Sequence, residues 1–129
     1  MTLLDTHVLL YWIGKSPKLS SAQREVLESD TPETPLYISD ITFWEIATLR
    51  SLKRIAVQGD SRSWLGEITA PPLVERLNIS PAVAAEVAAL PFHRDPGDRV
   101  IVASARVHGA TLLTQDRRII DAGLVRTLS

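Results

Sequence analysis

Short apolar segments alternate with longer helix-forming segments along the chain, and this alternation is the feature that most constrains the fold. Runs such as TLL and TLLT predict strands, whereas ITFWEIATLRSLKR and RVIVASARVHG have helical spacing of apolar residues. We expect strands at residues 2–5, 36–39, 73–79, 111–114 and 124–128. We expect helices at residues 7–14, 21–29, 41–54, 61–70, 81–90, 99–109 and 117–121. Strands separated by helices predict an α/β fold with a central, mainly parallel sheet flanked by helices.

Length and composition exclude several classes of protein. A chain of 129 residues fits one domain, which we expect to span residues 1–129. The chain has no cysteine, so any metal must be held by carboxylates or by the scattered His7, His93 and His108. No apolar run approaches the roughly 20 residues of a membrane span, and no basic residue precedes the first run as in a secretory signal. We therefore expect a cytoplasmic protein with no membrane partner. The net charge of −1 argues against a generic basic nucleic-acid binder.

Two aspartates directly follow expected strands. Asp5 follows TLL and Asp116 ends TLLTQD, so both are expected at the carboxyl ends of strands, where parallel sheets bind ligands. Each also has a structural interpretation as a helix N-cap or turn residue, worth about 1 kcal/mol. Thr6 could cap the first helix equally well, which would leave Asp5 available for another role.

Two further acids lie in expected helices. Glu45 follows the spacing of one helical face with Ile41, Trp44, Leu49 and Leu52. A carboxylate buried without a partner costs several kcal/mol, so this position requires a cation or hydrogen-bond donors. The alternative is a solvated flank of the helix or a pair with a distant arginine.

Asp98 shares a helical face with apolar residues such as Ile101 and Val102. Its structural interpretation is also specific, because Asp95, Pro96 and Asp98 fit an N-cap, the first helical position and the acid of a capping box. Whether Asp95 also contributes to a site is left open by the sequence.

The four acids together favour a metal site. Unit charges about 4 Å apart repel by about 4 kcal/mol at an effective dielectric near 20, more than the roughly 1 kcal/mol that a cap contributes. Convergence of the four therefore requires a counter-cation, and no lysine occurs after Lys53 to supply one. Carboxylates without cysteine or histidine select Mg²⁺ or Mn²⁺ over zinc.

Three segments resemble PIN-domain ribonucleases, in particular VapC-type toxins of bacterial toxin–antitoxin pairs. These segments are LLDTHVLLYWI, ISDITFWEIATL and LPFHRDPGDRVIVASARVHGATLLTQD, and they cover nearly the whole chain in the family's order. The resemblance places the family's four acids on Asp5, Glu45, Asp98 and Asp116. It also matches Thr6 and Thr114 to polar positions that support the acids. Gly97 departs from the pattern, since many relatives carry a bulky apolar residue there.

The resemblance implies endonucleolytic cleavage of RNA by water that one or two Mg²⁺ or Mn²⁺ ions activate in an in-line displacement. Asp5, Glu45 and Asp98 would be direct or water-mediated ligands, and Asp116 an outer or second-metal ligand. The remaining charge without the four acids is 14 − 11 = +3, which can attract a polyanion. The nearest arginines that could contact phosphate are Arg99, Arg117 and Arg118, although helix residues of this kind are often only solvated.

The family also implies a homodimer and a cognate antitoxin that covers the groove. Trp44, Trp64, Phe43 and Tyr11 could form an apolar patch for such a partner, or could pack in the core. Two other functions compete with the nuclease. One is a catalytically silent interaction module with the same fold, which the intact acids argue against. The other is a Mg²⁺-dependent phosphoacceptor signalling domain, which needs paired acids after its first strand and a lysine after its fifth.

Overall fold

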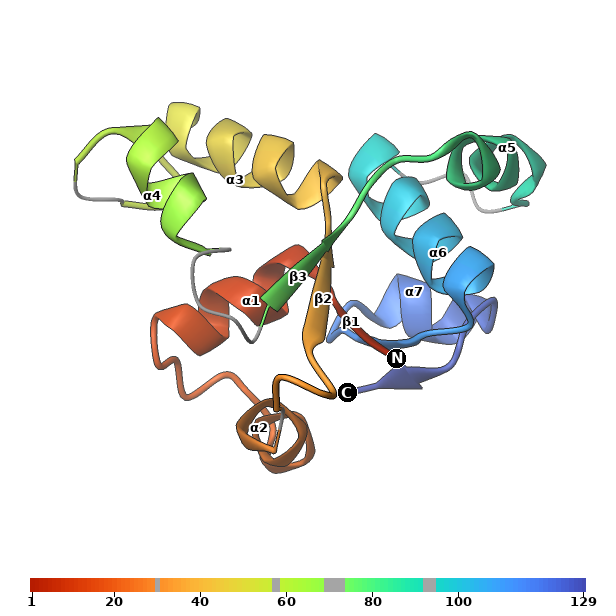
Figure 1. Ribbon diagram of the computed structural model, residues 1–129, viewed down its shortest axis with the longest axis horizontal. Helices are drawn as coiled ribbons and strands as arrows, with labels where there is room; N and C mark the ends of the chain where they lie inside the picture. Colours follow the sequence, from red (N-terminus) through yellow and green to blue (C-terminus); the bar gives the residue numbers. More distant parts are fainter. Residues whose placement is uncertain (30, 57–58, 69–73, 92–94) are drawn as a thin grey trace.

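A five-stranded parallel sheet forms the centre of the protein in the computed structural model, which describes residues 1–29, 31–56, 59–68, 74–91 and 95–129. Its strand order is β3-β2-β1-β4-β5, and every neighbouring pair is parallel. The strands are β1 (Thr2–Leu4), β2 (Leu36–Ser39), β3 (Val74–Leu77), β4 (Thr111–Leu113) and β5 (Thr127–Leu128). The predicted α/β fold with a parallel sheet is confirmed (Figure 1).

Helices flank the sheet on both sides (Figure 1). Those within the described residues are α1 (Thr6–Ile13), α2 (Ser21–Glu28), α3 (Ile41–Ser51), α4 (Ser61–Ile68), α5 (Pro81–Ala89), α6 (Pro96–His108) and α7 (Arg117–Ala122). Several predicted boundaries were wrong. The helix expected from residue 99 begins at Pro96 because Asp95 caps it, and the last strand is confined to Thr127–Leu128. Residues 69–70 and 73 of two expected elements, and His93, lie outside the described residues.

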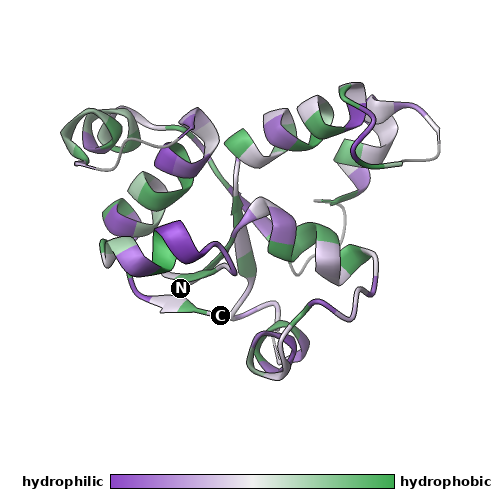
Figure 2. Cartoon of the chain, turned by 180° about the vertical axis from the view of Figure 1, so that it is seen from behind, coloured by the Kyte–Doolittle hydropathy of each residue, from purple (hydrophilic) through white to green (hydrophobic). Residues whose placement is uncertain are grey.

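Alternating side chains of the strands fill two cores, one on each face of the sheet. Leu3 and Leu112 contribute to the core beneath α5, α6 and α7, whereas their neighbours Leu4 and Leu113 contribute to the core beneath α1, α2 and α4. All four side chains are at most 1% exposed. A strand buried on both faces loses the apolar–polar alternation of a surface strand, which explains the uniform TLL runs. Hydrophilic residues remain on the helices (Figure 2).

The chain changes direction across the sheet at β1. After β1 it builds β2 and β3 on one side, and it then crosses to build β4 and β5 on the other. The loops that follow β1 and β4 therefore diverge at the shared carboxyl edge of these strands. Open α/β sheets bind their ligands at such a point, because diverging loops leave a crevice.

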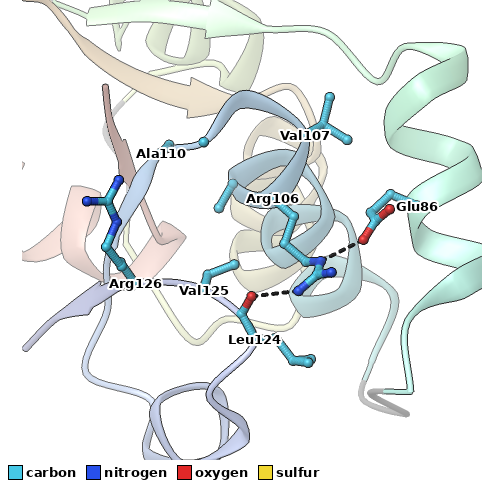
Figure 3. Close-up of a pocket in the computed structure, with 9 residues that line it drawn as sticks. Glu86, Arg106, Val107, Ala110, Leu124, Val125 and Arg126 are labelled. Carbon is cyan, nitrogen blue, oxygen red and sulfur yellow. Dashed lines mark hydrogen bonds and ion pairs between the residues drawn. The ribbon is translucent and has the colours of Figure 1, made fainter.

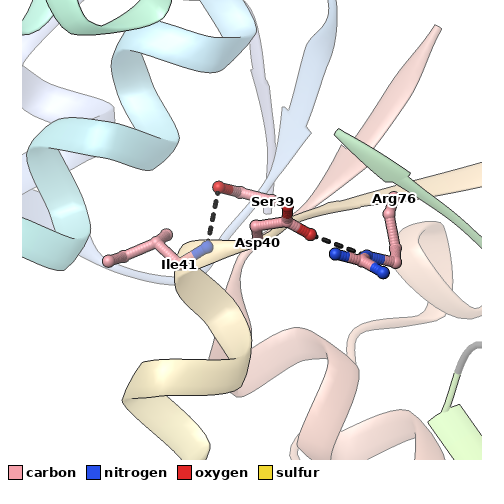
Figure 4. A network of polar contacts seen from close by, with 4 residues as sticks. All are labelled: Ser39, Asp40, Ile41 and Arg76. Atoms are coloured by element: carbon pink, nitrogen blue, oxygen red, sulfur yellow. Dashed lines mark hydrogen bonds and ion pairs between the residues drawn. The ribbon is translucent and has the colours of Figure 1, made fainter. Parts of the chain in front are cut away.

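Polar contacts fix the start of α3 against the sheet (Figure 4). Arg76 of β3 donates from Nε to Oδ1 of Asp40 at 2.8 Å, and the backbone N–H of Ile41 donates to the Ser39 hydroxyl at 3.2 Å.

A second set of polar contacts joins α6 to α5 and to the segment before β5. Arg106 of α6 donates to Glu86 of α5 at 2.6 Å and to the Leu124 carbonyl at 2.7 Å, beside a pocket of about 340 Å³ (Figure 3).

Candidate metal centre

A cavity of about 430 Å³ lies at the carboxyl ends of β1 and β4. Its walls come from α1, α3, the start of α6 and the segment between β4 and α7. The residues that line it are Asp5, His7, Val8, Tyr11, Glu45, Asp95, Asp98, Gln115, Asp116 and Arg118. All four acids selected from the sequence, and Asp95 in addition, therefore face one space.

Asp5 is the deepest of these acids, with 7% of its surface exposed. Its Oδ1 accepts a hydrogen bond from the Thr6 backbone N–H at 2.8 Å, and its Oδ2 accepts one from the Thr114 hydroxyl at 2.7 Å. Asp5 is thus the N-cap of α1, which confirms the structural interpretation considered for it, and Thr6, the alternative cap, does not take this role. Burial raises the pKa of Asp5, against the hydrogen bond from Thr114, which lowers it.

Glu45 of α3 accepts a hydrogen bond from a side chain of α1. The Thr6 hydroxyl donates to Oε1 of Glu45 at 2.6 Å, and it lies 3.0 Å from the hydroxyl of Thr42. A hydroxyl has one hydrogen to donate, and that of Thr6 is directed at Glu45. The Thr42 hydroxyl is therefore the donor in its hydrogen bond with Thr6. Burial raises the pKa of Glu45, and the charges of Asp5 and Asp95 raise it further, against the effect of the Thr6 hydroxyl.

The predicted buried face of α3 was wrong. Trp44 is 55% exposed and Leu52 is 58% exposed, whereas Thr42 and Ile46 are buried. Glu45 is half-buried at the flank of that face rather than inside an apolar stripe. The polar Thr42 can be buried because its hydroxyl is paired with Thr6, which removes the cost of an unsatisfied donor.

Asp95 and Asp98 lie at the first turn of α6. Oδ1 of Asp95 accepts from the Asp98 backbone N–H at 3.0 Å, which makes Asp95 the predicted N-cap. Single carboxylate oxygens of Glu45, Asp95 and Asp98 all lie within 4.8 Å of one another. Burial and then the adjacent Asp95 raise the pKa of Asp98 from 3.8 to about 8, so Asp98 keeps its proton to a higher pH than an ordinary aspartate does.

Gly97 leaves room for this cluster. A Cβ built on Gly97 would lie 2.5 Å from Cδ of Glu45, so a side chain at residue 97 would displace the Glu45 carboxylate. The departure from the family pattern noted in the sequence therefore coincides with a direct approach of Glu45 to the start of α6.

Asp116 lines the cavity from the segment between β4 and α7. Its Oδ1 accepts from the Arg118 backbone N–H at 2.9 Å as the N-cap of α7, and its own N–H donates to the Thr114 hydroxyl at 3.1 Å. Thr114 thus contacts both Asp5 and Asp116. Through these contacts, Thr6 and Thr114 each hold acids of the cavity in place.

The three arginines selected from the sequence have different surroundings. Arg118 lines the cavity. Arg117 pairs with the exposed Asp121 at 3.4 Å, and Arg99 donates to the Val87 carbonyl of α5 at 2.7 Å.

The sequence did not place His7, Tyr11 or Gln115 beside the acids, although all three also line the cavity. The rings of His7 and Tyr11 lie 6.2 Å apart, one helical turn along α1. The four-residue spacing of His7 and Tyr11, directly after Asp5, was the available signal, since residues i and i+4 share a helix face.

The donor set fits a hard divalent cation. Carboxylate oxygens are the ligands that Mg²⁺ and Mn²⁺ prefer, and Glu45, Asp95 and Asp98 bring one such oxygen each into a common cluster. Among the described residues that line the cavity, Arg118 is the only lysine or arginine. Each oxygen of Asp5 accepts one hydrogen bond and keeps a second lone pair for a ligand interaction.

The chain is 37% identical over 119 residues to "Ribonuclease VapC22" of Mycobacterium tuberculosis, covering 91% of this chain and 88% of the relative. Among solved structures, it is similar to FitAcB of Neisseria gonorrhoeae, with a TM-score of 0.70 and 26% identity over 100% of this chain and 97% of that one.

Other similar structures share the fold at lower identity. A toxin–antitoxin complex of Klebsiella pneumoniae has a TM-score of 0.69 and 20% identity over 100% of this chain and 97% of that one. VapBC2 of Rickettsia felis bound to promoter DNA has a TM-score of 0.71 and 18% identity over 98% of this chain and 96% of that one. The profile of the PIN domain matches residues 2–124, which include all five acids of the cavity. The chain therefore belongs to the PIN domain family.

Proposed function

We propose that this protein is a Mg²⁺- or Mn²⁺-dependent endoribonuclease, the toxin of a bacterial toxin–antitoxin pair. The observation that carries the proposal is the convergence of Asp5, Glu45, Asp95, Asp98 and Asp116 on one cavity at the edge of the sheet. Such a concentration of carboxylates is unfavourable unless a cation offsets it. The 37% identical relative is named a ribonuclease, which supports RNA as the substrate class.

Each acid has a role that follows from its position. Asp5, Glu45 and Asp98 would hold the cation directly or through water, Asp95 adds a fourth carboxylate beside them, and Asp116 would act as an outer or second-metal ligand. When bound, one or two such ions supply acidification of the attacking water and neutralisation of the charge that grows on the phosphate. Thr6 and Thr114 support the acids, since their hydroxyls donate to Glu45 and Asp5.

The substrate phosphate requires a positive group near the acids, and Arg118 has that position. Arg118 is exposed and lines the cavity, so its guanidinium can reach a phosphate there. Arg99 and Arg117 are engaged with Val87 and Asp121, so we assign them no primary phosphate contact. Arg118→Ala should raise the KM for RNA, whereas the neighbouring Arg117→Ala, a matched control of equal charge, should leave it unchanged.

We further propose a cognate antitoxin and a homodimer as partners. One similar structure, from Klebsiella pneumoniae, is described as a toxin–antitoxin complex, which supports the antitoxin. Of the four aromatics considered for a partner surface, Trp44 is 55% exposed, whereas Phe43, Trp64 and Tyr11 are partly buried against the core. A nuclease of cellular RNA acts in the cytoplasm, where we place this protein. No helix of the described residues is long and apolar enough to cross a membrane.

The other functions find less support. A phosphoacceptor domain needs paired acids after its first strand and a lysine after its fifth, whereas β1 is followed by Asp5 and Thr6 and no lysine follows Lys53. A silent interaction module has no need to keep five carboxylates in one cavity against their repulsion.

Cleavage of RNA by the purified protein tests the proposal. We expect cutting with Mg²⁺ or Mn²⁺, and its loss with EDTA, Asp5→Asn or Asp98→Asn. Asp121→Asn is the matched control, since Asp121 is exposed on α7 and does not line the cavity. Cleavage that survives chelation would refute the metal mechanism, and a metal-loaded protein that cuts no RNA would favour the silent module.

A further inference from the structure

Gln23 of α2 is a polar side chain sealed inside the protein. It is 0% exposed, and it is the only polar residue among the twelve largest fully buried side chains of the described residues. A buried amide is tolerated only when its donors and acceptor are paired. Its contacts therefore show what the residue holds together.

Every polar group of this amide has a partner. Nε2 donates to the Leu128 carbonyl at 2.8 Å and to the Thr114 carbonyl at 3.2 Å, and Oε1 accepts from Nε2 of Gln115 at 2.9 Å. The orientation of the amide is fixed by these partners, because both carbonyls require a donor. The Thr114 N–H also donates to the Leu128 carbonyl at 3.2 Å. Gln23 therefore binds the backbone of both β4 and β5 at the point where the hydrogen bonds between these two strands end.

The segment of residues 114–116 also forms part of the acidic cavity, because Gln115 and Asp116 line it. The Thr114 hydroxyl donates to Asp5 and accepts from the Asp116 N–H, while the Gln115 side chain donates to Gln23 and to the Lys18 carbonyl at 2.7 Å. Residues 114–116 are thus held from the interior by Gln23 and contact the acids on their other side. A shift of this segment would move the hydroxyl that orients Asp5 and the backbone that carries Asp116.

We propose that Gln23 is a positioning residue for the acidic cavity, acting through Thr114 and Gln115 on Asp5 and Asp116. The inference rests on the proposed function, since it assigns a role in metal and RNA handling to a helix that contributes no lining residue of the cavity. Groups that orient metal ligands through a second layer of hydrogen bonds commonly change metal affinity when they are replaced.

Gln23→Met tests this role, because methionine keeps the length of the side chain and removes its hydrogen bonds. The matched control is Leu27→Val, also on α2, where Leu27 is 0% exposed, packs in the core and does not line the cavity. For each protein we would measure unfolding by urea, the Mn²⁺ dissociation constant by calorimetry, and kcat and KM for RNA where all variants are folded.

We expect Gln23→Met to weaken Mn²⁺ binding by about tenfold and to lower kcat, with a smaller change in KM. Leu27→Val should leave Mn²⁺ affinity unchanged even where it loses as much stability. Equal effects of both variants, or unchanged Mn²⁺ affinity in Gln23→Met, would overturn the inference and leave Gln23 with a structural role alone.

Two further arms keep the test decisive. If Gln23→Met does not fold, Gln23→Asn keeps a buried amide but shortens its reach to the Thr114 and Leu128 carbonyls, and its Mn²⁺ affinity decides: a loss supports the inference and no change overturns it. If the wild-type protein binds Mn²⁺ and cuts no RNA, the proposed function fails. The Mn²⁺ dissociation constants of the wild type and the variants would still show whether Gln23 positions the acids.

Discussion

Replacing Asp98 with asparagine removes one charge from the acidic cluster and nearly preserves the shape of the side chain. The carboxylates of Glu45, Asp95 and Asp98 approach within 4.8 Å of one another. Two unit charges at that distance repel by about 3.5 kcal/mol at an effective dielectric of 20 and by about 1 kcal/mol in bulk water. Because Asp95 is exposed and Asp98 half-buried, we expect a relief of about 1–3 kcal/mol. The attraction of Asp98 to the N-terminus of α6 is typically about 0.3–1 kcal/mol and reaches about 2 kcal/mol only in favourable, partly buried geometries, so we expect the repulsion to dominate.

This gain in stability should depend on pH in one direction. The pKa of Asp98 is raised from 3.8 to about 8, first by burial and then by Asp95. The folded protein keeps a proton that the unfolded chain releases between about pH 4 and pH 8, so the wild type loses stability as the pH rises through this window. Asparagine does not titrate. The advantage of the variant should therefore be smallest near pH 4 and largest above pH 8.

Urea unfolding in EDTA at both ends of this window measures the effect. We expect Asp98→Asn to be more stable than the wild type above pH 8, and Asp121→Asn, at the exposed pair with Arg117, to differ little. Added Mn²⁺ should stabilise the wild type more than Asp98→Asn, because the variant lacks one ligand. A variant less stable than the wild type in EDTA above pH 8 would show that the carboxylates are not in conflict, and the reasoning would be wrong.

Three further predictions concern the same cavity. Thr6→Val removes the hydroxyl 2.6 Å from Glu45 and should reduce RNA cleavage by about tenfold, with recovery in Thr6→Ser; equal rates in all three proteins would contradict this. Gly97→Ala should weaken Mn²⁺ binding in calorimetry because its methyl group occupies the space of the Glu45 carboxylate. Gly66→Ala, in α4 where an added methyl group would meet open space, should leave binding unchanged. Mn²⁺ binding should release protons and strengthen as the pH rises toward about 8, since the cation competes with the proton on Asp98. Calorimetry in buffers of different ionisation enthalpy would detect the released protons, and a Mn²⁺ affinity that does not change with pH would contradict the prediction.

The α/β architecture could be predicted because strand burial leaves a local signature. Leu3 and Leu4 point into opposite cores, as do Leu112 and Leu113, so each central strand is apolar throughout. Element boundaries were harder, since they depend on which neighbour caps. Asp5 rather than Thr6 caps α1, whereas the Thr6 hydroxyl donates to Glu45, 39 residues away in the chain.

Four of the five acids that line the cavity could be selected from the sequence because each interrupts an apolar pattern, whereas the role of Asp95 was left open. The contacts that hold them could not. Gln23 lies in a polar helix, where it would be expected to face solvent, and its carbonyl partners are 91 and 105 residues away. Thr42 was overlooked for the same reason, since its burial depends on a hydroxyl of α1, 36 residues away in the chain. Such long-range pairs leave no periodic signal in a single sequence.

Anomalous diffraction from crystals soaked in Mn²⁺ tests the central claim most directly, namely that these acids gather around a divalent cation. We predict a Mn²⁺ peak in the cavity within coordination distance of carboxylate oxygens from Asp98, from Glu45 or Asp95, and from Asp5 directly or through water. A cavity without a peak at a Mn²⁺ concentration that supports RNA cleavage, or a peak bound elsewhere on the protein, would contradict it.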